Sequence, residues 1–133
     1  VQTFKKGDPV FASCGLRFGG YAEYTCLPVN ELISIKPSNM TFEEAATVPV
    51  GGLTALRFIK QSGLKKGDHI LVYGASGSVG TFAVQIAKSL GATITAVCST
   101  ANINLVTQLG AHKIIDYTRD DFTKTDTQVL KIC

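Results

Sequence analysis

The sequence lacks the marks of membrane, secreted and nucleic-acid-binding proteins. No apolar run approaches the roughly 18 residues of a membrane span, and the first residues, VQTFKKGDP, have no apolar signal-peptide core. The 13 basic and 10 acidic residues are scattered, so the net charge of +3 arises without the Lys/Arg stripe that phosphate-backbone binding needs. We therefore expect a soluble, cytoplasmic protein with no nucleic-acid partner and no membrane span.

Metal-ligand spacing is also missing from the sequence. The 4 cysteines are Cys14, Cys26, Cys98 and Cys133. They form no CxxC pair, and no histidine stands near them at ligand spacing. We predict free thiols in a reducing compartment and no metal site. His69 and His112 adjoin predicted strands, and we expect packed or solvated side chains there rather than a ligand or a base.

The first 40 residues have the pattern of short β-strands. Strands are expected at 9–12, 20–27 and 32–35, separated by glycine, proline and asparagine turns. A helix is expected after Thr41, whose hydroxyl and the carboxylate of Glu44 can form a capping box. Pro49 and the two glycines that follow it predict a break in this helix, and a second helix is expected over 53–61.

The rest of the chain alternates strands with helices. Apolar or β-branched runs predict strands at 70–73, 93–97 and 113–116, and helical periodicity predicts helices from Val79 to about Leu90 and over 102–109. This β-α-β-α-β order implies an α/β fold with a doubly wound parallel sheet of the Rossmann type. Three strands instead of the usual six are expected, so the sheet is partial. The last residues, QVLKIC, are a short apolar end.

A glycine-rich turn joins the first of these strands to its helix. The spacing is G-x-x-G-x-x-G, and in a dinucleotide site such glycines permit a tight turn, a close approach of the pyrophosphate and close helix–strand packing. Serine hydroxyls and the positive end of the helix dipole favour a phosphate at the same place. A turn that merely connects strand and helix also fits the motif, so the flanking elements carry the argument. The residues predicted to bind the pyrophosphate are Gly74, Ser76, Gly77, Ser78, Val79 and Gly80.

The end of the second strand bears on the choice of cofactor. NAD sites usually place an acid about 20 residues beyond the turn, where it binds the ribose hydroxyls. Here no acid occurs between Gly80 and Asp116, and Ser99, Thr100 and Asn102 could instead hydrogen-bond a 2′-phosphate. This favours NADPH. No arginine stands in this segment, so positive charge would come from Lys113, Arg119 or elsewhere.

The chain from Gly7 to Tyr117 resembles the medium-chain dehydrogenase/reductase superfamily, in its zinc-free quinone oxidoreductase-like branch. The matching tags, in order, are KGDPV at 6–10, GYAEY at 20–24, AATVP at 45–49, GLTA at 52–55, GASGSVG at 74–80, LGA at 109–111 and IDY at 115–117. Each tag is common alone, whereas their shared order is specific. The four-cysteine lobe and the catalytic Cys and His pair of the zinc-containing relatives have no counterpart in this sequence.

The resemblance implies zinc-independent hydride transfer from NADPH to a small molecule, either a quinone or an α,β-unsaturated carbonyl compound. It assigns Ser99 to the 2′-phosphate, Tyr117 to the ribose or phosphate region and Thr54 to the nicotinamide side. Thr54 could instead simply lie at a helix start, and Tyr117 could simply end a strand. In this branch the protein mainly orients the reactants and supplies a hydrogen-bond donor for the enolate or quinone oxygen. The sequence does not identify that donor, so no catalytic residue is assigned.

The resemblance also implies a division into domains. Residues 1–40 correspond to the end of a GroES-like catalytic domain, 41–66 to connecting helices and 67–133 to the first half of the nucleotide-binding domain. Family members are longer, and we expect a partial sheet to leave an edge open and to favour a homo-oligomer. Two alternatives stay open, an NADP-binding protein without turnover and an enoyl-thioester reductase.

Overall fold

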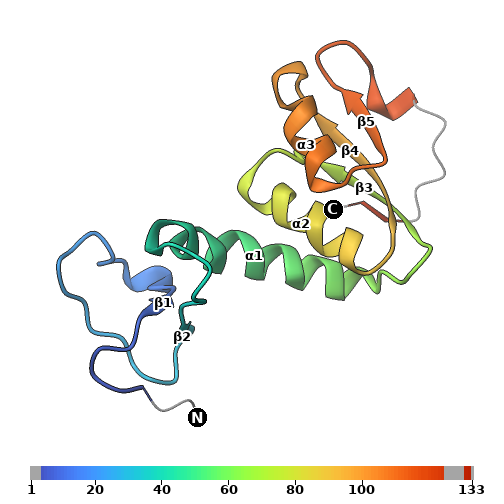
Figure 1. The fold of residues 1–133 in the computed structure, drawn as a ribbon. Coiled ribbons are helices and arrows are strands. Elements are labelled where there is room, and N and C mark those ends of the chain that lie inside the picture. The colour runs from blue at the N-terminus through green and yellow to red at the C-terminus, as the bar shows by residue number, and fades with distance from the viewer. Residues whose placement is uncertain (1–3, 125–130, 133) are drawn as a thin grey trace. The chain divides into compact units, whose positions relative to one another are not determined.

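The computed structural model describes residues 4–124 and 131–132 (Figure 1). The chain divides into two compact units, 1–50 and 51–133, each described by itself below. The boundary falls inside helix α1 (Phe42–Ser62). The three domains expected at 1–40, 41–66 and 67–133 stay a prediction.

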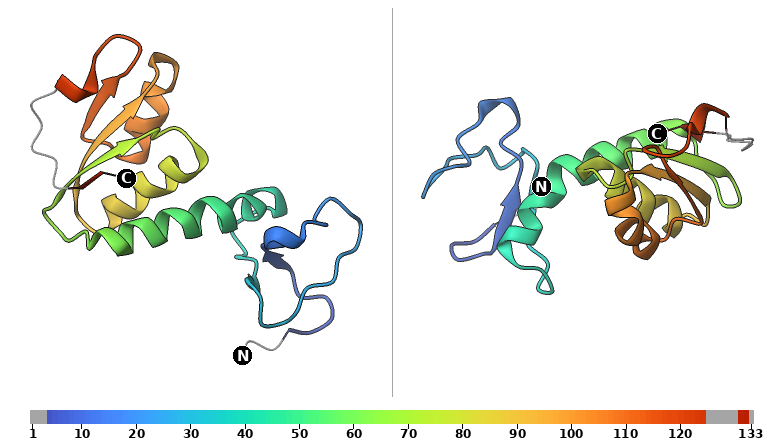
Figure 2. Two further views of the ribbon diagram at one scale, coloured as in Figure 1. Left: turned by 180° about the vertical axis from the view of Figure 1, so that it is seen from behind. Right: turned by 90° about the horizontal axis from the view of Figure 1, so that it is seen from above.

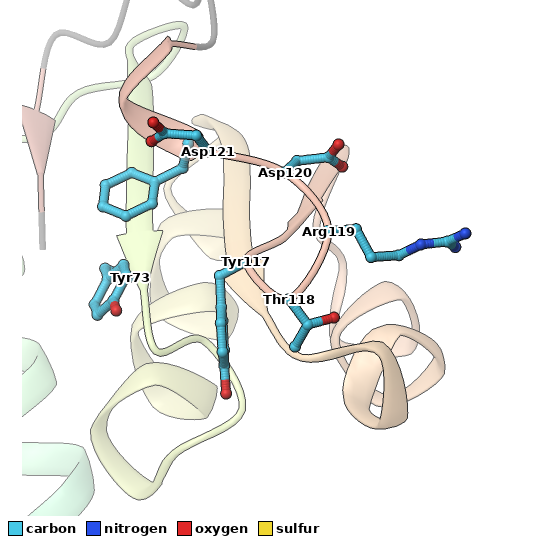
Figure 3. A pocket seen from close by; sticks show the side chains of 7 residues that line it. Tyr73, Tyr117, Thr118, Arg119, Asp120 and Asp121 are labelled. Carbon is cyan, nitrogen blue, oxygen red and sulfur yellow. The ribbon is translucent and has the colours of Figure 1, made fainter.

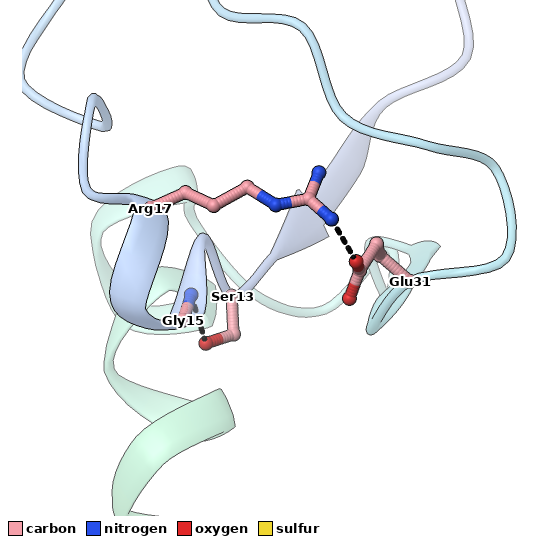
Figure 4. A network of polar contacts seen from close by, with 4 residues as sticks. All are labelled: Ser13, Gly15, Arg17 and Glu31. Carbon is pink, nitrogen blue, oxygen red and sulfur yellow. Dashed lines mark hydrogen bonds and ion pairs between the residues drawn. The ribbon is translucent and has the colours of Figure 1, made fainter.

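The first unit contains one pair of antiparallel strands, β1 (Val10–Ala12) and β2 (Ile33–Ile35). A short 3-10 helix, η1 (Gly15–Arg17), follows β1, and the Arg17 guanidinium donates to Glu31 Oε1 at 2.7 Å (Figure 4). The strand expected at 20–27 is wrong. The segment includes two tyrosines and a threonine, which favour strands, but no other segment among the described residues forms a ladder with it, and a strand needs that partner.

Helix α1 begins with the predicted capping box. The Thr41 amide donates to Glu44 Oε2 at 2.8 Å, and the Glu44 amide donates back to Thr41 Oγ1 at 3.1 Å. The predicted break at Pro49 and Gly51 is wrong, because the helix continues through both to Ser62. A Cβ on Gly51 would lie 2.5 Å from Ser78 Oγ, so this glycine allows close packing inside the second unit rather than ending the helix.

The second unit is built on a parallel four-stranded sheet. Its strands are β3 (His69–Tyr73), β4 (Thr93–Cys98), β5 (Lys113–Asp116) and β6 (Lys131–Ile132), in the spatial order β5-β4-β3-β6. Helix α2 (Ser78–Ser89) connects β3 to β4, and α3 (Ile103–Leu109) precedes β5. The predicted Rossmann-type fold is confirmed, whereas the expectation of only three strands is wrong, since β6 pairs with β3. The strand order reverses beside β3, which makes the carboxyl end of β3 the topological switch point.

Helices cover one face of this sheet (Figures 1 and 2). Small and branched side chains of α2, α3 and the second half of α1 bury Ile70, Val72 and Ile94 there. On the other face Leu71, Val97 and Ile115 pack with Phe122, which lies in the short helix η3 (Phe122–Lys124). Side chains of β3 are thus buried on both faces of the sheet. Every helix in the described part of the chain is too short or too polar to cross a lipid bilayer.

Candidate functional site

The turn after β3 folds around Gly74. Its φ of +71° lies in the left-handed region, which glycine adopts without strain. The next amide, of Ala75, donates to the Val97 carbonyl at 3.0 Å, and the Gly77 amide donates back to the Gly74 carbonyl at 2.9 Å. The turn is therefore fixed both to itself and to the end of β4.

The third glycine of the motif, Gly80, lies where α2 crosses this turn. A Cβ on Gly80 would lie 2.2 Å from the Gly74 carbonyl oxygen and 2.7 Å from Ala75 Cα. Both are backbone atoms of a fixed turn, so only glycine lets α2 approach this closely. The middle glycine, Gly77, has φ −80° and ψ 172°, which any residue adopts, and a Cβ there would lie 3.3 Å from the same oxygen. The fold therefore has far less need of a glycine at 77 than at 80.

The amino-terminal end of α2 is open. Gly77 is its N-cap and has no side chain to accept from the helix amides, and no acid lies in the first turn. The Thr81 amide donates to the Gly77 carbonyl at 2.9 Å, so the amides before it have no earlier helical carbonyl to reach. Ser78 is exposed, and Ser76 and Val79 are half-buried beside it. An uncapped helix end, next to a glycine without a Cβ, has the shape and the sign of charge that fit a pyrophosphate.

A hollow of about 190 Å³ opens beside the turn. Its lining residues are Phe58, Val72, Tyr73, Gly74, Gly77, Val79, Gly80 and Ala83. Phe58 and Tyr73 were not among the predicted site residues. Tyr73 could have been found as the last residue of the strand before the turn, and Phe58 as the residue one helical turn after Thr54. Thr54 itself is half-buried on that face of α1 but does not line the hollow.

Ser99 directly follows β4 and is the N-cap of the short helix η2 (Thr100–Asn102). Its hydroxyl caps no backbone amide of that helix. Instead Asn102 turns back, so that its Nδ2 donates to Ser99 Oγ at 3.1 Å and its backbone amide donates to the Ser99 carbonyl at 2.9 Å. Two of the three polar residues predicted around a 2′-phosphate, Ser99 and Asn102, are therefore hydrogen-bonded to each other.

Asp116, the last residue of β5, is the acid nearest to this helix in space although it is distant in sequence. It is buried, and it accepts from the hydroxyls of Thr100 and of Thr118, the latter at 2.7 Å, and from the Thr118 amide at 3.0 Å. The hydrogen bond from Thr100, then that from Thr118, holds the pKa of this carboxyl below its usual value, with the Arg119 charge as a smaller cause. The absence of an acid along the chain thus does not keep a carboxylate away from η2.

A second, open pocket of about 420 Å³ lies between the ends of β3 and β5 (Figure 3). The rings of Tyr73 and Phe122 pack against each other in it, tilted by 45° and 5.1 Å apart between centroids. Tyr117 is half-exposed, and its amide donates to the Cys98 carbonyl at 3.2 Å, which places it at the end of β4. Arg119 points away from Tyr73. Two cations were predicted to supply positive charge. Arg119 follows the carboxyl end of β5, whereas Lys113 is the first residue of β5 and lies at the amino ends of the strands.

The predicted residues therefore gather along the carboxyl edge of the sheet, except Thr54, which α1 contributes. Within residues 4–124 and 131–132, no three His, Cys, Asp or Glu side chains are placed together to hold a metal ion. The expectation of no metal site stays a prediction.

Comparison with known proteins adds the family. Residues 78–132 match the family described as zinc-binding dehydrogenase. The mouse protein "NAD(P)H oxidoreductase RTN4IP1, mitochondrial" is 44% identical over 124 residues, covering 89% of this chain and 31% of that protein. The tomato "2-methylene-furan-3-one reductase" is 37% identical over 131 residues, covering 92% of this chain and 34% of that protein.

A solved structure of the quinone oxidoreductase from Coxiella burnetii superposes with a TM-score of 0.66 at 37% identity, covering 69% of this chain and 29% of that one. The chain thus spans about a third of the length of the proteins that it matches. The predicted resemblance is confirmed. This chain belongs to the medium-chain dehydrogenase/reductase superfamily, in its quinone oxidoreductase-like branch.

Proposed function

We propose that the protein is an NADPH-dependent oxidoreductase that reduces a quinone or an α,β-unsaturated carbonyl compound without zinc. The observation that supports this most strongly is the uncapped end of α2 at the switch point of the sheet, reached through a turn that only Gly74 and Gly80 allow. Crevices at such switch points are where open α/β sheets bind their ligands.

In this proposal the pyrophosphate lies against the first turn of α2. The amides of that turn and the Ser78 hydroxyl donate to it, and Gly77 leaves room for its approach. Tyr117 borders the ribose or phosphate, and Thr54 faces the nicotinamide from α1. The nicotinamide, once bound, supplies the hydride. The residues proposed to hold the cofactor are Thr54, Gly74, Ser76, Gly77, Ser78, Val79, Gly80, Ser99 and Tyr117.

The preference for NADPH rests on the end of β4. An NAD site has there a carboxylate with free oxygen lone pairs for the ribose hydroxyls. Here Ser99 takes that place, and the nearby carboxylate of Asp116 already accepts from Thr100 and Thr118. A carboxylate that already accepts three hydrogen bonds is a poorer partner for ribose hydroxyls than a free one. The Ser99 hydroxyl, by contrast, can donate to a phosphate.

The test is a fluorescence titration of the intact protein with NADPH and with NADH, followed by oxidation assays with a quinone, an enone and an enoyl thioester. Tighter binding of NADPH and its oxidation by the quinone or the enone are expected. Oxidation only by the enoyl thioester would favour the reductase of that class, and binding without any oxidation would leave a binding protein. Failure to bind either dinucleotide would refute the proposal.

Three further parts of the proposal need separate measurements. Activity that survives dialysis against a chelator supports zinc independence. A sedimentation mass above that of one chain supports the homo-oligomer, and a lone monomer contradicts it. Cell fractionation tests the cytoplasmic location, for which the mouse relative, named as mitochondrial, gives a specific alternative.

A further inference from the structure

We propose that Asn102 is a positioning residue that makes the Ser99 hydroxyl a hydrogen-bond donor toward the 2′-phosphate of NADPH. The inference rests on the proposed function and goes beyond it, because it assigns the selectivity for the phosphate to a pair of side chains rather than to Ser99 alone. It follows from the directions of the hydrogen bonds around η2.

The first step concerns the Ser99 hydroxyl. Asn102 Nδ2 has hydrogens and no free lone pair, so in the 3.1 Å bond it donates and Ser99 Oγ accepts. A serine hydroxyl has one hydrogen and two lone pairs, and accepting from Asn102 directs its hydrogen elsewhere. Ser99 also caps no amide of η2. Among the described residues nothing else holds this hydroxyl, so its hydrogen is available for a ligand.

The neighbouring hydroxyl, of Thr100, donates within the protein. Thr100 Oγ1 bonds to Asp116, whose pKa is lowered and whose carboxylate therefore only accepts. The hydrogen of Thr100 thus points inward to β5 and not toward a ligand. Thr118 adds two more bonds to the same carboxylate and keeps it in place. Of the two hydroxyls that directly follow β4, Ser99 is the one that can donate outward.

The consequence is a difference in affinity between NADPH and NADH, which differ only in having a phosphate or a hydroxyl at the 2′ position. Only NADPH has the phosphate that accepts from Ser99, so a change at Asn102 should affect NADPH and leave NADH nearly unchanged. A hydrogen bond to a charged acceptor corresponds to about tenfold in affinity. Loss of its orientation alone is expected to have a smaller effect, roughly fivefold.

A double-mutant cycle on the intact protein tests this, with NADPH and NADH affinities measured by fluorescence titration. Asn102→Ala is expected to weaken NADPH roughly fivefold and NADH by less than about twofold. In a Ser99→Ala background the same change should have no further effect on NADPH, because the hydroxyl that it orients is absent. Equal losses with and without Ser99 would overturn the proposal, since Asn102 would then act on the phosphate directly.

A second pair of variants controls for charge and for folding. Asn102→Asp reverses the bond, so that the Ser99 hydroxyl donates inward, and it also adds a negative charge. Asn104→Asp adds the same charge two residues later, on an exposed position of α3. We expect at least about a tenfold loss of NADPH affinity for the first and less than about threefold for the second. Equal losses in two variants with wild-type circular dichroism would overturn the proposal. A wild-type protein that binds neither dinucleotide would refute the proposed function as well.

Discussion

Gly80→Ala tests whether the glycine turn is as tightly packed as the structure indicates. In most helices this change is stabilising by about 1 kcal/mol, because alanine has the higher helix propensity. Here the new Cβ would lie 2.2 Å from the Gly74 carbonyl oxygen and 2.9 Å from the Ala75 carbonyl carbon. Neither can move without disturbing the bond from Ala75 to Val97.

The cost of such overpacking is about 3 kcal/mol, at the upper end of the usual range because backbone atoms must move. After the gain in propensity we expect a net loss of about 2 kcal/mol, or roughly 10 °C in the melting temperature. The matched control is Gly77→Ala, where the dihedral angles suit alanine and the Cβ would lie 3.3 Å from the same oxygen.

Thermal melts followed by circular dichroism, with NADPH titration of each variant, separate the two roles. Gly77→Ala should lower the free energy of unfolding by about 1 kcal/mol or less and should melt within a few degrees of the wild type. It should nevertheless bind NADPH weakly, because its Cβ would occupy the space proposed for the pyrophosphate. Gly80→Ala should instead melt well below the wild type. A Gly80→Ala protein that melts at or above the wild-type temperature would refute the close approach of α2 to the turn.

The remaining predictions concern charge and reactivity. The pKa of Asp116 is lowered in the folded protein, so its contribution to stability is complete above its unfolded pKa of about 3.9 and is lost as the pH falls through the folded value. In thermal melts at decreasing pH, the melting temperature should therefore fall less below about pH 4 for Asp116→Asn than for the wild type. Burial above all, and the Asp116 charge, raise the pKa of the Cys98 thiol, so alkylation mapped by mass spectrometry should label exposed Cys26 long before Cys98, and equal rates would contradict that burial. Arg119→Ala should weaken the binding of NADPH roughly threefold more than that of NADH. Lys113→Ala removes the same charge at the amino end of β5 and should leave the ratio of the two affinities unchanged.

Those features that depend on neighbours in sequence could be predicted. The β-α-β-α-β order follows from local periodicity, and the sheet confirms it. The capping box needed only Thr41 and Glu44 at the right spacing. The conformation of Gly74 and the contact of Gly80 agree with the roles that the motif gives those glycines. The capping box and the glycine turn each lie within one turn of a helix or one strand–helix junction, and each element of the β-α-β-α-β order follows from the residues of that element alone.

The wrong predictions depend on contacts between distant segments. Proline and glycine predict a helix break, but α1 continues because Gly51 packs against Ser78 and because Ala55 and Ile59 are buried in the core. The segment 20–27 has strand-forming residues but no ladder partner in the part of the chain that the structure describes. The two residues of β6 form a strand because they pair with β3. Strand formation is decided by pairing, which local propensity cannot supply.

Asp116 shows the same limitation at the candidate site, and there it changes the chemistry. It follows Ser99 by a whole helix and a strand along the chain, beyond the spacing at which a ribose-binding acid is expected. Parallel pairing of β4 with β5 places Asp116 opposite Cys98, directly beside η2. Thr100 and Thr118 donate three hydrogen bonds to its carboxylate there, and its lowered pKa keeps the negative charge beside η2. In the proposed site, selectivity for a 2′-phosphate at Ser99 therefore depends on an oriented hydroxyl and on a cation that offsets the Asp116 charge, rather than on the absence of an acid.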